Sequence, residues 1–331
     1  MTDGFVISKN LSLLDGRIRA AMATDAPKRL KECLSSMPDR VLTVGTGGSY
    51  ASALFAAKAI SAFERSIAVS ARPRDALLRG VDKYDLVILF SYSGTTPDIR
   101  EVVRVCDEKG VKTLLITALD PLAEGCPCAA EDVVSYGVSE PDFEEKGFIS
   151  MASTLIPICL FADRYYGKGF EKMYRDVFEA REKEFRERRI LGGSERPLMI
   201  DVFSAYDTET ASAVLESDIT ESGIGRATVH EKKDFSHGRY NALEGSRSDV
   251  AVFLNNAVGA YTETLIGYLR SRNYPLFEIT TERSGIWGDF DLTVAAQFFV
   301  TKLSEETGYD MSDPTYPVEA KSLYKYIGDL L

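Results

Sequence analysis

Two stretches of the sequence align with each other without a gap, and this internal repeat constrains the fold more than any other feature. Residues 87–117 read VILFSYSGTTPDIREVVRVCDEKGVKTLLIT, and residues 250–280 read VAVFLNNAVGAYTETLIGYLRSRNYPLFEIT, in a register that pairs Phe90 with Phe253. Each stretch opens on an apolar run typical of a buried strand, continues with apolar residues at helical spacing, and ends in a second apolar run. We therefore expect two copies of one strand-helix-strand unit.

The same alternation of strand and helix extends over most of the chain. Expected strands lie at 40–45, 66–72, 85–90, 111–118, 197–204, 248–254 and 274–280, and expected helices at 49–63, 97–110, 149–167, 207–222 and 259–273. The strands are apolar on both faces, which is typical of a parallel sheet covered by helices on both sides. The sequence therefore predicts an α/β fold with parallel sheets.

Composition indicates where the chain divides. With 331 residues, 45% of them hydrophobic, it is long enough for two domains or one large bilobal unit. The highly charged stretch 170–190 is typical of a solvated connecting helix. We expect an N-terminal helical segment at 1–34, a first subdomain at 35–168, the connecting helix at 169–194, a second subdomain at 195–308 and a C-terminal tail at 309–331.

Several classes of partner are disfavoured. The net charge of −11 repels polyanions and argues against nucleic acid. No apolar stretch is long enough to span a bilayer, and the start MTDGFVISKN lacks the features of a signal peptide, so we expect no membrane partner and a cytoplasmic location. The five cysteines are scattered, and Cys126 and Cys128 are too closely spaced for a zinc knuckle, so we expect no metal site.

The stretch FSYSGTTPD, residues 90–98, places four hydroxyl groups around Gly94 directly behind an apolar strand. In an open parallel sheet, ligands bind outside the carboxyl ends of the strands. There a glycine lets the backbone turn sharply, and neighbouring N–H and hydroxyl groups suit a phosphate monoester. Helix capping alone would predict similar chemistry in both copies, but the second copy has LNNAVGA at this point. We therefore interpret the cluster as a ligand site.

A second glycine-rich loop, GTGGSYAS, follows the first expected strand and offers Ser49 as a further donor. This loop lacks the third glycine of a dinucleotide fingerprint, and neither loop carries the Gly-Lys-Ser/Thr of a Walker motif. The two loops therefore predict a small phosphorylated ligand and no organic cofactor.

These motifs resemble the SIS (sugar isomerase) family, in particular the isomerase half of glucosamine-6-phosphate synthase and the related sugar-phosphate deglycases and deaminases. The resemblance covers nearly the whole chain and implies two tandem flavodoxin-like subdomains, each with three α/β/α layers. It implies that the phosphate is held by Ser49, Ser91, Ser93, Gly94 and Thr96, and that Gly47, Gly48 and Tyr92 bind the substrate. The segment EKGFIS resembles a family segment that faces the sugar, which implies substrate contacts for Glu145 and Ser150.

The resemblance also implies catalytic residues in the second copy. The family carries a glutamate base sixteen positions before a His-Gly pair, as do Glu221 and His237 here. Moving a carbonyl between C1 and C2 suits a carboxylate base, and ring opening suits a histidine that passes a proton at neutral pH. Lys321 lies in a segment similar to that of the synthase lysine that reaches the sugar, although it could be a surface lysine. We expect His230 to be an ordinary strand or loop residue.

Three positions depart from the family pattern. Arg239 follows the His-Gly pair where the family usually has proline, Tyr92 stands where the synthase has an amide, and Thr95 replaces its glutamate. Arginine and tyrosine here predict that the substrate carries a second anionic or planar group.

Two functions remain open on the sequence alone. In the first, the protein is an isomerase, deaminase or deglycase that acts on a phosphorylated keto or amino sugar, without the synthase's glutaminase domain. In the second, it is a non-catalytic sugar-phosphate-binding regulator. The spacing of Glu221 and His237 favours the enzyme, and no DNA-binding helix-turn-helix precedes the first strand. The resemblance further implies a homodimer with shared active sites.

Overall fold

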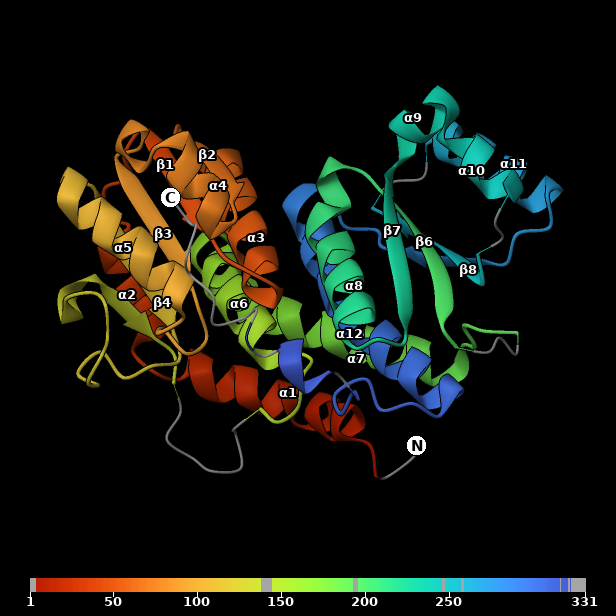
Figure 1. The fold of residues 1–331 in the computed structure, drawn as a ribbon, viewed down its shortest axis with the longest axis horizontal. Coiled ribbons are helices and arrows are strands. Elements are labelled where there is room, and N and C mark those ends of the chain that lie inside the picture. The colour runs from red at the N-terminus through yellow and green to blue at the C-terminus, as the bar shows by residue number, and fades with distance from the viewer. Residues whose placement is uncertain are drawn as a thin grey trace. The chain divides into compact units, whose positions relative to one another are not determined.

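The computed structural model describes residues 4–137, 145–192, 196–245, 248–256, 259–315, 317–320 and 322 (Figure 1). These residues form two compact units. The N-terminal unit is built mainly from Leu13–Glu145 and Met151–Glu171. The C-terminal unit is built mainly from Lys172–Thr315, together with Lys146–Ser150 and residues up to Ser12. Each unit contains one parallel sheet, as the alternation of apolar strands and helices predicts.

The N-terminal unit has a sheet in the order β2-β1-β3-β4-β5, with every pair of neighbours parallel. Its strands are β1 (Arg40–Val44), β2 (Ile67–Ala71), β3 (Leu86–Phe90), β4 (Lys112–Thr117) and β5 (Val133–Ser135). Its helices are α2 (Ala26–Cys33), α3 (Gly48–Phe63), α4 (Pro73–Arg79), α5 (Pro97–Lys109) and α6 (Ala152–Tyr166), and α1 (Val6–Met22) precedes them. This strand order is that of flavodoxin-like doubly wound sheets, so the expected fold class is confirmed.

Local sequence explains where α5 begins and ends. Pro97 occupies the first turn, where its missing N–H leaves no hydrogen bond unmade, and Gly110 follows the last residue in a left-handed conformation with φ of +66°. Between these ends, Ile99, Val102 and Cys106 recur at helical spacing and are buried in one cluster with the strands of the sheet. The amphipathic pattern therefore fixes which face of α5 covers the sheet.

The C-terminal unit has a parallel sheet in the order β7-β6-β8-β9. Its strands are β6 (Leu198–Ser204), β7 (Gly225–Glu231), β8 (Val250–Asn255) and β9 (Leu276–Thr280). Its helices are α8 (Glu209–Glu221), α9 (Lys232–Asp234), α10 (Tyr240–Gly245), α11 (Ala260–Ser271) and α12 (Gly285–Thr307), and α7 (Phe170–Glu187) precedes the first strand.

The two sheets confirm the internal repeat. The order β7-β6-β8-β9 repeats the order of the first four strands of the other sheet. In the sequence alignment Pro97 is equivalent to Ala260, and these two residues begin α5 and α11. Gly110 and Asn273 are also equivalent, and both adopt the left-handed conformation, with φ of +66° and +57°. Asparagine tolerates this conformation better than most side chains, so the repeat extends to the helix ends.

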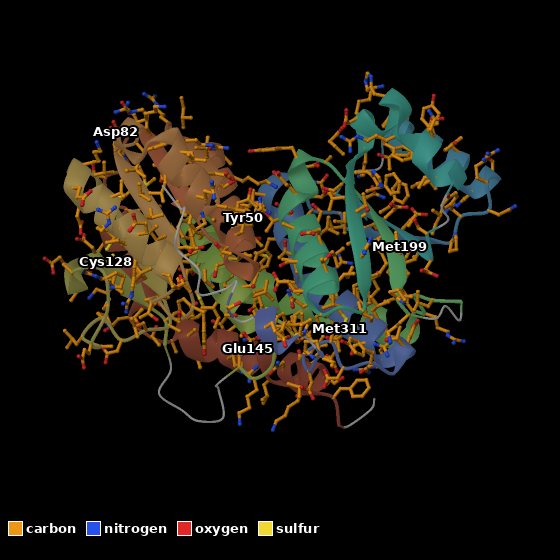
Figure 2. The ribbon with its side chains drawn as sticks, in the orientation of Figure 1. Tyr50, Asp82, Cys128, Glu145, Met199 and Met311 are labelled. Atoms are coloured by element: carbon orange, nitrogen blue, oxygen red, sulfur yellow. The ribbon has the colours of Figure 1, made fainter. Side chains whose placement is uncertain are left out.

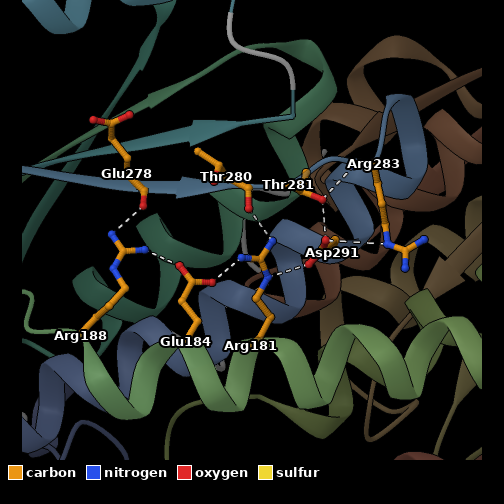
Figure 3. A network of polar contacts seen from close by, with 8 residues as sticks. All are labelled: Arg181, Glu184, Arg188, Glu278, Thr280, Thr281, Arg283 and Asp291. Atoms are coloured by element: carbon orange, nitrogen blue, oxygen red, sulfur yellow. Dashed lines mark hydrogen bonds and ion pairs between the residues drawn. The ribbon is translucent and has the colours of Figure 1, made fainter.

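One face of α7 is packed, although its charge predicts a solvated helix. Arg181 is only 6% exposed, and its guanidinium donates to Asp291 Oδ1 and to the carbonyl oxygen of Thr280, each over 2.7 Å (Figure 3). Arg188 donates to the carbonyl oxygen of Glu278 over 2.7 Å. These contacts tie α7 to β9 and α12, so the solvated-helix prediction is wrong for this face.

Within the described part of the chain, no helix combines the length and the apolar character that crossing a membrane requires.

Candidate functional site

Two loops of the N-terminal unit begin where the strand order reverses. β1 and β3 are neighbours in the sheet, but the chain runs from β1 to β2 on one side before it returns to β3 on the other. The loops after β1 and β3 start at the carboxyl edge of the sheet, and they lead into α3 and α5. In open α/β sheets, ligands bind at this switch point. We call these two loops, residues 45–49 and 91–96, the cradle.

Gly94 fixes the shape of the second cradle loop. Its φ is +66°, and a Cβ atom there would lie 2.9 Å from Thr117 Oγ1 and 3.0 Å from Leu119 Cδ2. The Gly94 N–H donates to both the carbonyl oxygen and Oγ of Ser91, each over 3.2 Å. Thr117 Oγ1 donates to the carbonyl oxygen of Tyr92 over 3.0 Å. Only glycine suits this position, because both the conformation and the space exclude a side chain.

The hydroxyl groups of this loop divide into two kinds. Ser91 is 6% exposed, and its oxygen serves the turn of the loop itself. Ser93 is exposed, and its Oγ accepts only a long 3.4 Å hydrogen bond from the Thr95 N–H. Thr96 is the N-cap residue of α5, yet its side chain makes no capping hydrogen bond. Helix capping therefore does not account for the cluster, and Ser93 and Thr96 can donate to a ligand.

The first cradle loop brings backbone close to backbone. A Cβ atom on Gly45 would lie 2.2 Å from the carbonyl oxygen of Ser49, so no side chain fits there. Gly47 is the N-cap residue of α3 with φ of +57°, and its carbonyl oxygen accepts from the Tyr50 N–H over 2.9 Å. Gly48 and Ser49 follow in the first turn of α3, partly exposed. The N–H groups of this turn and the Ser49 hydroxyl suit an anion.

Arg72 supplies a positive charge at the same edge of the sheet. The Gly45 N–H donates to the carbonyl oxygen of Ala71 over 3.3 Å, which places the end of β2 beside the first cradle loop. Arg72 is exposed, and its Cζ lies 4.3 Å from the centroid of the Tyr50 ring. Tyr50 is labelled in Figure 2. None of the ion pairs between described residues involves Arg72. Sequence reasoning missed this residue, although its position directly after a strand was a usable signal.

Asp98 lies in the first turn of α5, close to the cradle in sequence. Desolvation by burial raises the pKa of its carboxyl group. A negative charge at this helix end would oppose a bound phosphate.

Glu145 caps the helix that follows it. Its Oε1 accepts from the Met151 and Ala152 N–H groups over 2.7 Å each, and its Oε2 accepts from the Ser153 N–H over 3.0 Å and from Ser153 Oγ over 2.8 Å. A carboxylate is well placed at the N-terminus of α6, where it neutralises unpaired donors and the helix dipole. The structure therefore gives Glu145 a capping role that sequence reasoning missed. Ser150 is partly exposed and belongs to the C-terminal unit.

Glu221 is the last residue of α8. Its Oε1 accepts from Ser217 Oγ over 2.6 Å, one helical turn earlier. Desolvation by the surrounding protein raises the pKa of the Glu221 carboxyl group, against the lowering effect of the Ser217 hydrogen bond, and the nearby charge of Glu216 adds to the rise. The side chain as a whole remains accessible to solvent. A reachable carboxylate with a raised pKa has the properties of a general base.

His237 lies in a turn with an irregular backbone. The helical geometry breaks at His237 and at Gly238, whose φ of +100° is compatible with few other residues. The His237 side chain is exposed. Across the same turn, Arg239 Nε lies 2.8 Å from Asp234 Oδ2, so part of the Arg239 charge is already neutralised.

Glu221 and His237 lie beyond opposite ends of β7. Glu221 ends the helix that precedes this strand, and His237 follows α9, which begins where the strand ends (Figure 1). The strand has seven residues. At about 3.3 Å per residue, it separates its two ends by about 20 Å. Two side chains so placed in one chain cannot both touch adjacent carbons of one sugar.

The predicted site residues thus fall into two groups. The cradle residues Gly47, Gly48, Ser49, Ser91, Tyr92, Ser93, Gly94 and Thr96 belong to the N-terminal unit, with Glu145, whereas Ser150, Glu221, His237 and Arg239 belong to the C-terminal unit. Lys321 lies outside the described residues. His230 is buried in β7 and its Nε2 lies 2.8 Å from Asp201 Oδ1, as an ordinary strand residue would.

Other candidate sites carry less chemistry. No cluster of three or more histidine, cysteine, aspartate or glutamate residues in the described part of the chain is suited to a metal ion. A hollow of about 390 Å³ lies beside Leu86 and Lys112, at the amino ends of β3 and β4 and therefore at the edge opposite the cradle. Its charged lining mixes both signs, with Arg29 and Lys112 against Glu32, Glu131 and Asp132.

Comparison with known proteins agrees with the strand order. Residues 35–151 match the SIS domain family model, so this stretch is a SIS domain. The match covers the whole first sheet and both cradle loops. Among curated proteins, none matches the sequence.

Solved structures share the fold over nearly the full chain. Tagatose-6-phosphate ketose/aldose isomerase from Escherichia coli superposes with a TM-score of 0.75 at 15% identity, covering 96% of this chain and 98% of that one. Glucosamine-6-phosphate deaminase from Thermotoga maritima gives 0.69 at 16%, covering 93% and 98%. The C-terminal domain of glucosamine-fructose-6-phosphate aminotransferase from Francisella tularensis gives 0.63 at 14%, covering 95% and 99%. At these identities the likeness establishes the fold.

Proposed function

We propose that the protein is an enzyme that moves a proton between C1 and C2 of a phosphorylated keto or amino sugar, as an isomerase, deaminase or deglycase in the cytoplasm. The observation that carries the proposal is the cradle at the switch point of the first sheet. Its glycines hold the backbone open to a ligand, and the hydroxyls of Ser93 and Thr96 cap no helix. Such a site suits a phosphate monoester.

The residue roles follow from their chemistry. Ser49, Ser93 and Thr96 donate to the phosphate, while Ser91 and Gly94 keep the loop in shape. Glu221 removes the proton beside the carbonyl and returns it to the neighbouring carbon. Its raised pKa makes the carboxylate a stronger base than an ordinary glutamate.

His237 passes the proton that opens the sugar ring, because imidazole exchanges protons near neutral pH without large pKa tuning. Lys321 would polarise the carbonyl of the open chain. Arg239 and Tyr92 would contact the second anionic or planar group of the substrate.

The active enzyme is a homodimer in this proposal, and each site takes Glu221 and His237 from different subunits. The separation of about 20 Å along β7 supports this arrangement, because it keeps the two side chains of one chain apart. A second subunit can bring its own His237 to the Glu221 of the first, as an isologous dimer would do twice.

The names of the solved relatives support the substrate class. The isomerase, the deaminase and the aminotransferase domain are all named for sugars that carry a 6-phosphate. A hexose 6-phosphate is therefore the first substrate to test, and tagatose 6-phosphate, fructose 6-phosphate and glucosamine 6-phosphate form the core of a panel.

A non-catalytic regulator that binds a sugar phosphate is the second candidate. The observation that favours it is the extent of the family match, which covers residues 35–151 and the cradle but none of the second copy. A protein that retained only binding would keep this part of the chain under the stronger constraint.

The test combines ligand binding with turnover. The protein is heated with each member of a panel of phosphorylated ketoses, aldoses, amino sugars and fructosamines, and each mixture is also followed by nuclear magnetic resonance for product. A ligand at 100 times its dissociation constant stabilises the folded state by about 2.7 kcal/mol. Stabilisation with turnover supports the enzyme, stabilisation without turnover supports the regulator, and neither effect with any sugar phosphate contradicts both.

A further inference from the structure

Lys232 is a buried cation at the carboxyl edge of the second sheet. It is 7% exposed and follows β7 directly. Its Nζ donates to the carbonyl oxygen of Leu254 and to Asn255 Oδ1, each over 2.6 Å. These acceptors belong to the last two residues of β8, and β6 lies between β7 and β8 in the sheet. The Lys232 side chain therefore bridges two strands that are not neighbours.

The backbone of Lys232 is held as firmly as its side chain. Tyr261, on α11, donates its hydroxyl to the Lys232 carbonyl oxygen over 2.8 Å. Three residues further along, Phe235 is 1% exposed and its ring centroid lies 4.9 Å from that of Phe203. The turn that carries His237 therefore starts from a polar anchor at Lys232 and an apolar anchor at Phe235, while the His237 side chain itself is exposed.

A catalytic role for Lys232 itself does not fit these contacts. Desolvation lowers its pKa to about 8, with Asp207 and Glu231 opposing the shift, and a lowered pKa is what a Schiff-base lysine needs. However, Nζ is buried against a carbonyl and an amide oxygen, so no substrate carbon can reach it. A buried ammonium that gives two of its three N–H groups to local acceptors is a structural tie whose removal leaves those acceptors unpaired.

We propose that Lys232 is a positioning residue that fixes the turn bearing His237 to the end of β8. This inference rests on the proposed function, in which His237 passes the ring-opening proton. Misplacing a proton-transfer group by about 1 Å can cost about 100-fold in rate, so holding His237 in place affects turnover. In this proposal Lys232 affects the rate only through the position of His237.

The neighbouring residue offers a matched control. Lys233 is exposed, and its Nζ lies over the Tyr261 ring, 4.6 Å from the centroid. Lys232→Met and Lys233→Met change the same functional group at adjacent positions, but only the first removes the tie to β8. Tyr261→Phe loosens the same anchor by one hydrogen bond and serves if Lys232→Met does not fold.

The first readout does not depend on activity. The chain has two histidines, so the imidazole signals of His230 and His237 can be assigned by nuclear magnetic resonance. We expect Lys232→Met or Tyr261→Phe to shift or broaden the His237 signal and Lys233→Met to leave it unchanged. An unchanged His237 signal in both anchor variants overturns the inference, even if the proposed function has failed.

The second readout is a double-mutant cycle on turnover. We expect Lys232→Met to lower kcat by about 10- to 100-fold with little change in KM, and to have less than about a twofold effect when His237 is already alanine. An equal loss in both backgrounds shows that Lys232 acts on the fold and not through His237, and it contradicts the proposal.

Discussion

Glu221 and His237 lie beyond opposite ends of a single strand, β7, so one chain presents its carboxylate and its imidazole about 20 Å apart. The sixteen-residue spacing between them is therefore not a sign that they touch. It reflects the path from the end of a helix, through one strand, to the turn beyond it. If both groups act on one sugar, they come from two copies of the chain.

Mixing two inactive variants tests this arrangement. Glu221→Gln and His237→Ala each remove one group from every site of their own homodimer. In a mixed dimer, one site collects both lesions and the other is intact, so we expect activity to recover to about a quarter of the wild-type value after subunit exchange. No recovery, although mixed dimers form, would show that both groups of a site belong to one chain.

The pH dependence of turnover tests the tuning of Glu221. The hydrogen bond from Ser217 Oγ lowers the pKa of the carboxyl group, so Ser217→Ala raises that pKa further. A base works only when deprotonated, so we expect the acid limb of the kcat/KM profile to move to higher pH. Thr220→Ala, an exposed neighbour on α8, is the control. An unmoved acid limb in Ser217→Ala would assign that limb to another group.

Two glycines with the same backbone conformation separate cradle shape from general stability. Gly94 and Gly110 both have φ of +66°, but a Cβ atom meets Thr117 and Leu119 at Gly94 and nothing within 4 Å at Gly110. Alanine at either site costs about 1–2 kcal/mol for the left-handed conformation. We expect only Gly94→Ala to lose phosphate binding, measured by calorimetry with inorganic phosphate. Comparable affinities for the two variants would remove the Gly94 loop from the binding site.

Arg72 is expected to raise the affinity of the cradle for anions. Its guanidinium lies over Tyr50, the residue after Ser49, and a charge-assisted hydrogen bond contributes about 1.5–3 kcal/mol when shielded from water. Because Arg72 is exposed, we expect Arg72→Ala to weaken phosphate binding by a smaller factor, about 3- to 10-fold, with a flatter salt dependence. Arg79→Ala, at the other end of α4, should bind as the wild type does. Equal phosphate affinities for Arg72→Ala and Arg79→Ala would show that Arg72 does not contact the anion, and the anion would then lie away from the end of β2.

Much of the fold could be predicted because its signals are local and occur twice. The repeat predicted two parallel sheets, and α5 and α11 begin at equivalent residues, Pro97 and Ala260. By contrast, the sequence did not distinguish whether the segment of β7 forms a strand or a loop. This strand lies at an edge of the sheet, and its exposed residues alternate with buried ones, so it lacks a continuous apolar run. The packed face of α7 was missed because Arg181 reads as a solvated charge until its partners, distant in sequence, are known.

The candidate site stays a prediction, and sequence pointed to it where residue chemistry and position along the chain coincide. The loop around Gly94 indicated a ligand site because its serines, threonines and glycine follow an apolar strand in the first copy, whereas the second copy has LNNAVGA at the equivalent positions. The capping role of Glu145 and the anchoring role of Lys232 were not predictable, since both depend on which backbone groups the fold brings to them. Sequence shows that a carboxylate or an ammonium is present, but only the fold shows whether it is free to meet a ligand.

Replacing Glu221 by glutamine should not weaken the fold at neutral pH. The folded state raises the pKa of this carboxyl group, so it binds the proton more tightly than the unfolded state does. Stability therefore falls as pH rises through the interval between the ordinary and the raised value, and the ionised carboxylate remains a cost above it. We expect Glu221→Gln to melt at the same or a higher temperature than the wild type at pH 8, with the difference vanishing in acid. A clear loss of stability at pH 8 would contradict the raised pKa.

With that control in hand, one measurement tests proton transfer by Glu221 most directly. The sugar phosphate that gives turnover is incubated with enzyme in heavy water, and deuterium at C1 and C2 is followed by nuclear magnetic resonance. We expect the wild type to exchange a proton at one of these carbons and the folded Glu221→Gln variant to be slower by about 100- to 10,000-fold. Exchange at the wild-type rate in the variant would show that Glu221 is not the base.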